Sequence, residues 1–165
     1  MNEAQFIGRN FASGFKGKFL AMGEWSEVTR SLLEAGWTGV VADHLAAELS
    51  KDAAMDGVIY VHGPIGMENH YVEVELNYKM RCVTLRDILD TFPGPFNLLL
   101  VSVPGLGKDL STCDAVWNMW PEVICVHSEG REQEIVNLAN QHSYNPSRIE
   151  RDSLILARVA KAGPK

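Results

Sequence analysis

Five short segments of the sequence hold residue types that could do chemistry, and each follows directly after an apolar run. A glycine lets the backbone approach a ligand closely, and a carboxylate accepts charge-assisted hydrogen bonds from hydroxyl groups. If the apolar runs are parallel strands, their carboxyl ends meet along one edge of a sheet, where α/β proteins bind ligands. We therefore expect a ligand site built from residues of Gly23-Glu24, Asp43-His44, His62-Gly63, Ser102 to Gly107 and His127 to Glu129.

Nucleophilic catalysis is not favoured by this set of residues. Ser102 could serve as a nucleophile with His62 or His127 as its base. However, no serine stands in a Gly-x-Ser-x-Gly elbow, and no aspartate is assigned to orient a histidine. The segment Pro104 to Lys108 also lacks the Gly-x-x-x-x-Gly-Lys-Ser/Thr spacing of a phosphate-binding loop. We expect neither a hydrolase nor a protein that binds nucleoside triphosphates.

The spacing of the cysteines and histidines predicts no metal site. No Cys-x-x-Cys or His-x-x-x-His pair occurs in the sequence. The odd number of cysteines, in apolar surroundings, predicts reduced thiols in the core. The histidines are expected at the surface or hydrogen-bonded in the core. The residues concerned are Cys82, Cys113, Cys125, His44, His62, His70, His127 and His142.

Composition and charge indicate an acidic globular protein of one domain, residues 1–165. The chain is 46% hydrophobic and carries a formal net charge of -6. A negative protein repels polyphosphate backbones and anionic lipid surfaces, so nucleic-acid and membrane roles are disfavoured. The start of the chain has no basic region followed by an apolar one, and no apolar run approaches the ~18 residues that span a bilayer. We therefore expect a cytoplasmic protein.

Short apolar runs alternate with helical patterns along almost the whole chain, which predicts an α/β fold. We expect a Rossmann-like, doubly wound, mainly parallel sheet with an antiparallel strand pair, in three α/β/α layers. The predicted strands are 18–22, 37–42, 58–61, 96–103, 123–127 and 153–159, and the predicted antiparallel pair is 71–76 with 80–83. The predicted helices are 3–13, within an N-terminal segment 1–14, and 24–35, 44–55, 84–92, 110–119 and 131–142. The run 96–103 is the most apolar and should lie mid-sheet, and the tail 160–165 should be flexible.

Several motifs, taken in order, resemble one enzyme family. Phe19 to Glu24 and Leu32 to Asp43 are similar to the opening of FkbM-type S-adenosylmethionine (SAM) methyltransferases. In that family a strand and a glycine-rich loop lead to a helix ending Leu-Glu-x-Gly-Trp-x-Gly, and the next strand closes on an acidic residue. The resemblance continues through Val83 to Leu89, Phe96 to Gly105, Pro121 to Val126 and Asp152 to Leu156. It covers about residues 15–159.

The resemblance implies SAM as cofactor and names the residues that would bind it. Gly23 and Glu24 stand in the turn after the first strand, Asp43 at the end of the second, and Ser102 after the central strand. Gly23, Glu24 and Asp43 also have a structural explanation. Asp43 could cap the following helix, and a glycine and a glutamate suit any turn from a strand into a helix. The four tryptophans are expected to pack in the core.

The sequence departs from the family pattern at the acidic strand-end positions. Ala21 stands where the family has an acid in the first strand, predicted here as 18–22. His127 stands where the family has an acid at the end of the strand predicted here as 123–127. The family's Asp-Val-Glu-Gly after the central strand becomes Ser102-Val103-Pro104-Gly105. Asp43 is the acidic position that remains.

Three functions stay open at this stage. The first is a methyltransferase-like protein that is weakly active or non-catalytic and serves as a binding or structural module. The second is an active SAM-dependent methyltransferase, since methyl transfer depends mainly on placing donor and acceptor in line. The third is a fold that binds another small ligand, with Ser102 and His127 as polar contacts. The partner of the protein would be a small molecule or another protein. A homo-oligomer is compatible with the short chain.

Overall fold

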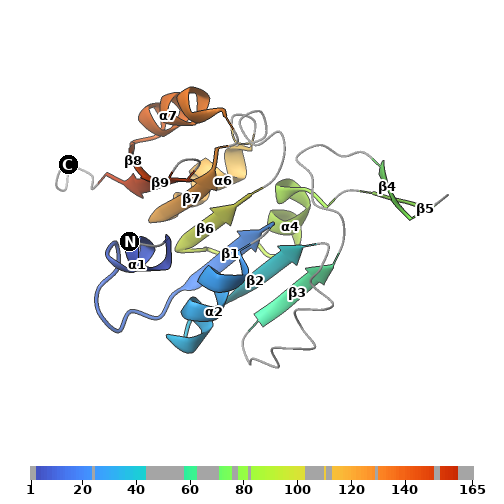
Figure 1. Ribbon diagram of the computed structural model, residues 1–165, viewed down its shortest axis with the longest axis horizontal. Helices are drawn as coiled ribbons and strands as arrows, with labels where there is room; N and C mark the ends of the chain where they lie inside the picture. The colour runs from blue at the N-terminus through green and yellow to red at the C-terminus, as the bar shows by residue number, and fades with distance from the viewer. Residues whose placement is uncertain are drawn as a thin grey trace.

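The computed structural model describes residues 3–23, 25–43, 58–62, 71–75, 78–81, 83–102, 110, 113–128, 130–150 and 153–159. A seven-stranded sheet forms the centre of the molecule, with strand order β3-β2-β1-β6-β7-β9-β8 (Figure 1). Its strands are β1 (Lys18–Met22), β2 (Thr38–Asp43), β3 (Val58–His62), β6 (Leu98–Val101), β7 (Val123–His127), β8 (Tyr144–Glu150) and β9 (Ser153–Arg158). The strands β1, β2, β3, β6 and β7 pair in parallel. The prediction of a Rossmann-like, mainly parallel α/β sheet is confirmed.

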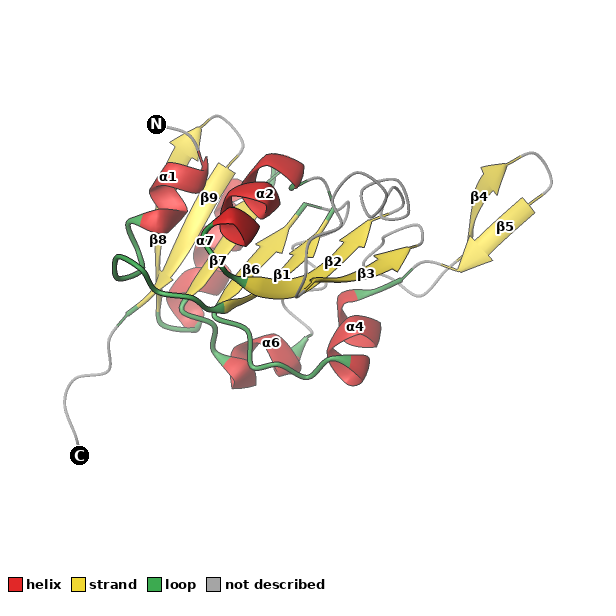
Figure 2. Ribbon diagram, turned by 90° about the horizontal axis from the view of Figure 1, so that it is seen from below, coloured by secondary structure: helices red, strands yellow, loops and turns green. Residues whose placement is uncertain are grey.

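Helices cover both faces of this sheet. Figure 2 shows α1 (Glu3–Gly8) and α2 (Ser26–Glu34) on one face, and α4 (Leu85–Thr91) and α6 (Asp114–Met119) on the opposite face. The helix α7 (Glu132–Gln141) covers the same face as α4 and α6, because its buried residues belong to the same core cluster as theirs. No helix among the described residues is long and apolar enough to cross a membrane.

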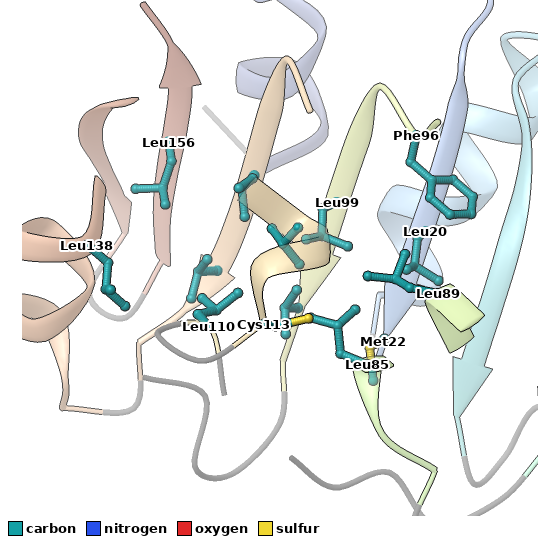
Figure 3. Close-up of a cluster of buried hydrophobic side chains, with 14 of the residues drawn as sticks. Leu20, Met22, Leu85, Leu89, Phe96, Leu99, Leu110, Cys113, Leu138 and Leu156 are labelled. Atoms are coloured by element: carbon teal, nitrogen blue, oxygen red, sulfur yellow. The ribbon is translucent and has the colours of Figure 1, made fainter. Parts of the chain in front are cut away.

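Side chains alternate between the faces along each strand, so the sheet separates two apolar clusters. Phe19 and Ala21 of β1 pack with α1 and α2. Leu20 and Met22 point to the opposite face, where Figure 3 shows them in one cluster with Leu85 and Leu89 of α4. The same cluster includes Leu110 and Cys113, which precede α6. The central strand β6 is buried on both faces, as its uninterrupted apolar run predicts.

The start of α4 follows the sequence signal closely. The Thr84 hydroxyl accepts from the Asp87 amide at 3.1 Å, and the Thr84 amide donates to the Asp87 carboxylate at 3.0 Å. This reciprocal pair is a capping box, which satisfies two amide groups at the first turn. Gly36 likewise ends α2 with a φ of 89°, as its position after the helix predicts.

Other elements differ from the predictions. Helix α1 ends at Gly8 instead of near residue 13, and α6 begins at Asp114. The antiparallel pair β4 (Tyr71–Glu75) and β5 (Tyr78–Arg81) is present, but it forms a separate two-stranded sheet that projects from the large one (Figure 1). Strand β8 was not predicted, because Pro146 and its polar neighbours are typical of a loop. It is an edge strand, where a proline is tolerated.

Two predicted segments, the helix 44–55 and the tail 160–165, lie outside the described residues. Tryptophans Trp25 and Trp37 are buried, as expected, and Trp117 and Trp120 are partly buried against the core.

Candidate functional site

The carboxyl end of β1 packs tightly against the end of β6. The Ser102 amide donates to the Met22 carbonyl at 2.9 Å, and the Gly23 amide donates to the Ala42 carbonyl at 3.0 Å. Gly23 has a φ of 89°, and a Cβ atom placed on it would lie 2.0 Å from the Ser102 carbonyl oxygen. A glycine is therefore required here both for its backbone conformation and for the close approach of the two strand ends.

Four side chains form a hydrogen-bonded chain next to this junction. The Oγ atom of Ser102 lies 2.8 Å from Nδ1 of His127. The other ring nitrogen of His127, Nε2, lies 2.9 Å from Oε1 of Glu3. The Ser153 hydroxyl donates to the same Glu3 oxygen at 2.6 Å. These hydrogen bonds join α1 to the ends of β6 and β7 and to the start of β9.

Strand geometry explains why these groups meet. Ser102 follows β6, and His127 ends β7, and both continue the side-chain positions that face α1 and α2. Ser153 is the register partner of His127 in the antiparallel pairing of β9 with β7. Glu3 lies in the first turn of α1, where a carboxylate also suits the helix dipole.

The contacts of Glu3 favour its ionised form and suit one tautomer of His127. The hydrogen bonds from His127 and Ser153 hold the pKa of the Glu3 carboxyl below its ordinary value of 4.5, against the opposing effect of burial. In the tautomer that carries its proton on Nε2, His127 donates to the ionised Glu3 carboxylate, and its Nδ1 atom accepts a hydrogen bond from the Ser102 hydroxyl.

Trp25 holds the imidazole from one face. The indole and imidazole rings are stacked with centroids 4.1 Å apart and an interplanar angle of 21°. The indole nitrogen Nε1 donates to the Met22 carbonyl at 3.0 Å, which fixes the indole at the end of β1. The His127 side chain keeps 26% of its surface exposed. The ring is thus held in orientation and still reaches solvent.

The structure describes the four cofactor-binding candidates to different extents. Gly23 and Ser102 are in contact at the sheet edge. Asp43 ends β2 in register with His62, and for these two the backbone alone is described. Glu24 lies outside the described residues.

Sequence reasoning missed three members of this site. The sequence assigned no aspartate to orient a histidine, but a glutamate takes that position: Glu3 lies 2.9 Å from Nε2 of His127, although the two residues are 124 positions apart. Ser153 and the stacked Trp25 were also not identified as site residues. An acidic residue in the first turn of a helix was the one local signal, and it gives no information about a distant partner.

Metal ligands do not gather in the described part of the chain: it contains no group of three histidine, cysteine, aspartate or glutamate residues that could hold an ion. Cys113 and Cys125 are buried thiols that form no disulfide, as predicted. Burial raises the pKa of the Cys125 thiol, so it stays protonated and unreactive. Cys82 lies outside the described residues.

No protein-family model matches the sequence, and no curated protein matches it. Several solved structures, however, share its fold. An rRNA methylase from Streptococcus thermophilus aligns with a TM-score of 0.57 and 6% identity, over 97% of this chain and 98% of the other. The magnesium protoporphyrin IX methyltransferase from Synechocystis PCC 6803, solved with bound SAM, aligns with a TM-score of 0.56 and 11% identity, over 94% and 77%.

The chain has a methyltransferase fold. A third methyltransferase, the 1,6-didemethyltoxoflavin-N1-methyltransferase of Burkholderia thailandensis with bound S-adenosylhomocysteine, aligns with a TM-score of 0.53 and 13% identity, over 95% and 76%. The predicted fold is confirmed by these alignments. At this low identity the methyltransferase fold is the feature that the proteins share.

Proposed function

We propose that this methyltransferase-fold protein, of the FkbM type, transfers methyl groups weakly or not at all and serves as a binding or structural module. One observation carries the proposal. The strand-end positions that hold acids in that family are occupied here by Ala21 and by the hydrogen-bonded pair Ser102 and His127. The side chains of Ser102 and His127 are hydrogen-bonded to each other, and His127 is also hydrogen-bonded to Glu3.

Ala21 supports the proposal through its surroundings. It is fully buried in the apolar cluster beneath α1 and α2. A cofactor amino group at the end of β1 would therefore find no carboxylate from this position, and the methyl group of alanine offers no hydrogen bond.

The expected loss of cofactor affinity is large. A hydrogen bond to a charged group contributes about 1.5–3 kcal/mol, and about 1.4 kcal/mol corresponds to a tenfold change in Kd. Replacing the acids at the ends of β1 and β6 should weaken SAM binding by about a hundredfold or more. A cofactor that an intact site binds at micromolar concentration would then need roughly millimolar concentration.

The partner of such a module would be a small molecule or another protein in the cytoplasm. The net charge of -6 argues against nucleic acid and anionic membranes. A homo-oligomer is compatible with the proposal. A small ligand at the carboxyl edge of the sheet would meet the partly exposed Ser102 and His127.

The second candidate is an active SAM-dependent methyltransferase. Two observations favour it: Gly23 keeps a positive φ in the turn after β1, and Asp43 is retained at the end of β2. In this case Gly23, Glu24, Asp43 and Ser102 would bind SAM. Backbone amides can contact the cofactor without any particular side chain.

Methyl transfer separates the two candidates. Purified protein is incubated with SAM labelled in its methyl group and with cell extract fractions of protein and small molecules. The proposal expects label at, or only slightly above, that of a sample with heat-denatured protein. Strong label that appears with native protein and disappears in Asp43→Ala would favour the active enzyme.

A further inference from the structure

The hydrogen-bonded chain at the sheet edge has the arrangement of an activated nucleophile. A serine hydroxyl lies within hydrogen-bond distance of an imidazole nitrogen, and a carboxylate orients the imidazole from its other nitrogen. Nucleophile, base and orienting group in that order are the signature of covalent catalysis by serine. We propose that Ser102 is a nucleophile toward small esters, with His127 as its general base and Glu3 as the residue that positions His127.

The proton positions fit these roles. Glu3 is ionised at neutral pH and accepts the proton on Nε2, so Nδ1 is free to accept the Ser102 proton. The two ring nitrogens thus exchange the places they have in the serine protease triad, where the carboxylate binds Nδ1. The function of the ring is unchanged, because either nitrogen can act as base when the other carries the proton.

The surroundings hold the base without covering the nucleophile. Trp25 stacks on one face of the imidazole, and Ser153 fixes the Glu3 carboxylate by a second hydrogen bond. Ser102 is half-buried and the His127 side chain is 26% exposed. Both residues therefore keep contact with solvent, from which a small ester would approach.

The proposed reaction uses water as its second reactant. Oγ of Ser102 attacks the ester carbonyl carbon, and its proton moves to Nδ1 of His127. The bond to the alcohol oxygen breaks, and the leaving alcohol takes the proton from Nδ1. Water then attacks the acyl group through the same base, which releases the acid and restores the serine. The net result is hydrolysis of an ester to an acid and an alcohol, independent of SAM.

The test uses two probes on the full-length protein, diisopropyl fluorophosphate and p-nitrophenyl acetate. Peptide mass mapping of the treated wild-type protein should place the phosphoryl adduct on Ser102. Ser102→Ala should lose the adduct and lower the hydrolysis rate by at least about 100-fold, because the loss of a triad nucleophile has a large effect on the rate. The matched control is Ser31→Ala, which removes an exposed serine of α2 and should change neither result.

The role of Glu3 is tested by separating kcat from KM. Glu3→Gln keeps the shape of the side chain but removes the negative charge beside the ring, so kcat for p-nitrophenyl acetate should fall about tenfold while KM stays unchanged. A purely structural role would lower the amount of folded protein but leave kcat per folded molecule unchanged.

Two results would overturn the proposal. One is the absence of an adduct on Ser102 in the wild-type map, which needs no variant and so does not depend on the folding of Ser102→Ala. The other is an unchanged hydrolysis rate in a folded Ser102→Ala. Neither result bears on methyl transfer, because SAM is absent from both assays.

Discussion

Glu3 and Ser153 stand 150 positions apart in the sequence, and their side chains are joined by a hydrogen bond of 2.6 Å. The bond ties the first helix to the strand β9 near the end of the chain. Because Glu3 also binds His127 on β7, one carboxylate links three elements around the carboxyl edge of the sheet. The N-terminal helix is therefore a structural part of the site, although the sequence gives it no such signal.

Removing the Glu3 carboxylate should destabilise the fold. Glu3→Gln replaces an ionised acceptor of two hydrogen bonds and leaves the 4% exposed Ser153 with a weaker partner. The expected loss is about 1.5–3 kcal/mol in the free energy of unfolding, measured by urea denaturation at pH 7. Glu27→Gln is the control, because Glu27 also lies in the first turn of a helix but is exposed, and it should change the free energy by no more than about 0.5 kcal/mol.

The effect of Glu3 should depend on pH. Its folded pKa lies below the ordinary value of 4.5, so its contribution is fully present above pH 4.5 and is lost as the pH falls through the folded pKa. The difference in unfolding free energy between wild type and Glu3→Gln should shrink as the pH falls below 4.5. A difference that does not shrink on acidification well below pH 4.5 would contradict the assignment of Glu3 as the ionised partner.

The contact between Gly23 and Ser102 predicts an unusually costly glycine. Gly23→Ala places a Cβ atom against the Ser102 carbonyl in addition to straining a φ of 89°. Gly130→Ala has nearly the same strain, with a φ of 83°, but nothing lies within 4 Å of its Cβ. We expect a loss of about 1–2 kcal/mol for Gly130→Ala from strain alone. Thermal unfolding should show a larger loss for Gly23→Ala, and equal losses would mean that the two strand ends separate freely.

The capping box of α4 gives a third stability test. Thr84→Ala removes the hydroxyl that accepts from the Asp87 amide and should cost about 1 kcal/mol. Thr84→Ser retains the hydroxyl and should recover most of the loss. If both variants are equally destabilised, the lost methyl group and not the cap determines the stability of this helix start.

The fold could be predicted from the sequence because its signals are local. Uninterrupted apolar runs predicted the buried parallel strands, and Thr84 with Asp87 predicted the start of α4. Strand β8 was not predicted, because it contains Pro146 and polar neighbours, which a strand tolerates only at a sheet edge.

The site could be predicted in part. Ser102 and His127 were recognised as strand-end residues, since strand ends follow from the strands themselves. Their bond to each other, and the bond of His127 to Glu3, depend on which strands are neighbours and on where α1 packs. No spacing in the sequence carries this information.

The central claim concerns the cofactor, and calorimetric titration with SAM and S-adenosylhomocysteine tests it most directly. We expect no heat of binding at micromolar ligand, and at most weak binding at millimolar ligand, in both the wild-type protein and Asp43→Ala. Micromolar binding by the wild-type protein that is lost in Asp43→Ala would contradict the account and establish a functional SAM site at the ends of β1 and β2.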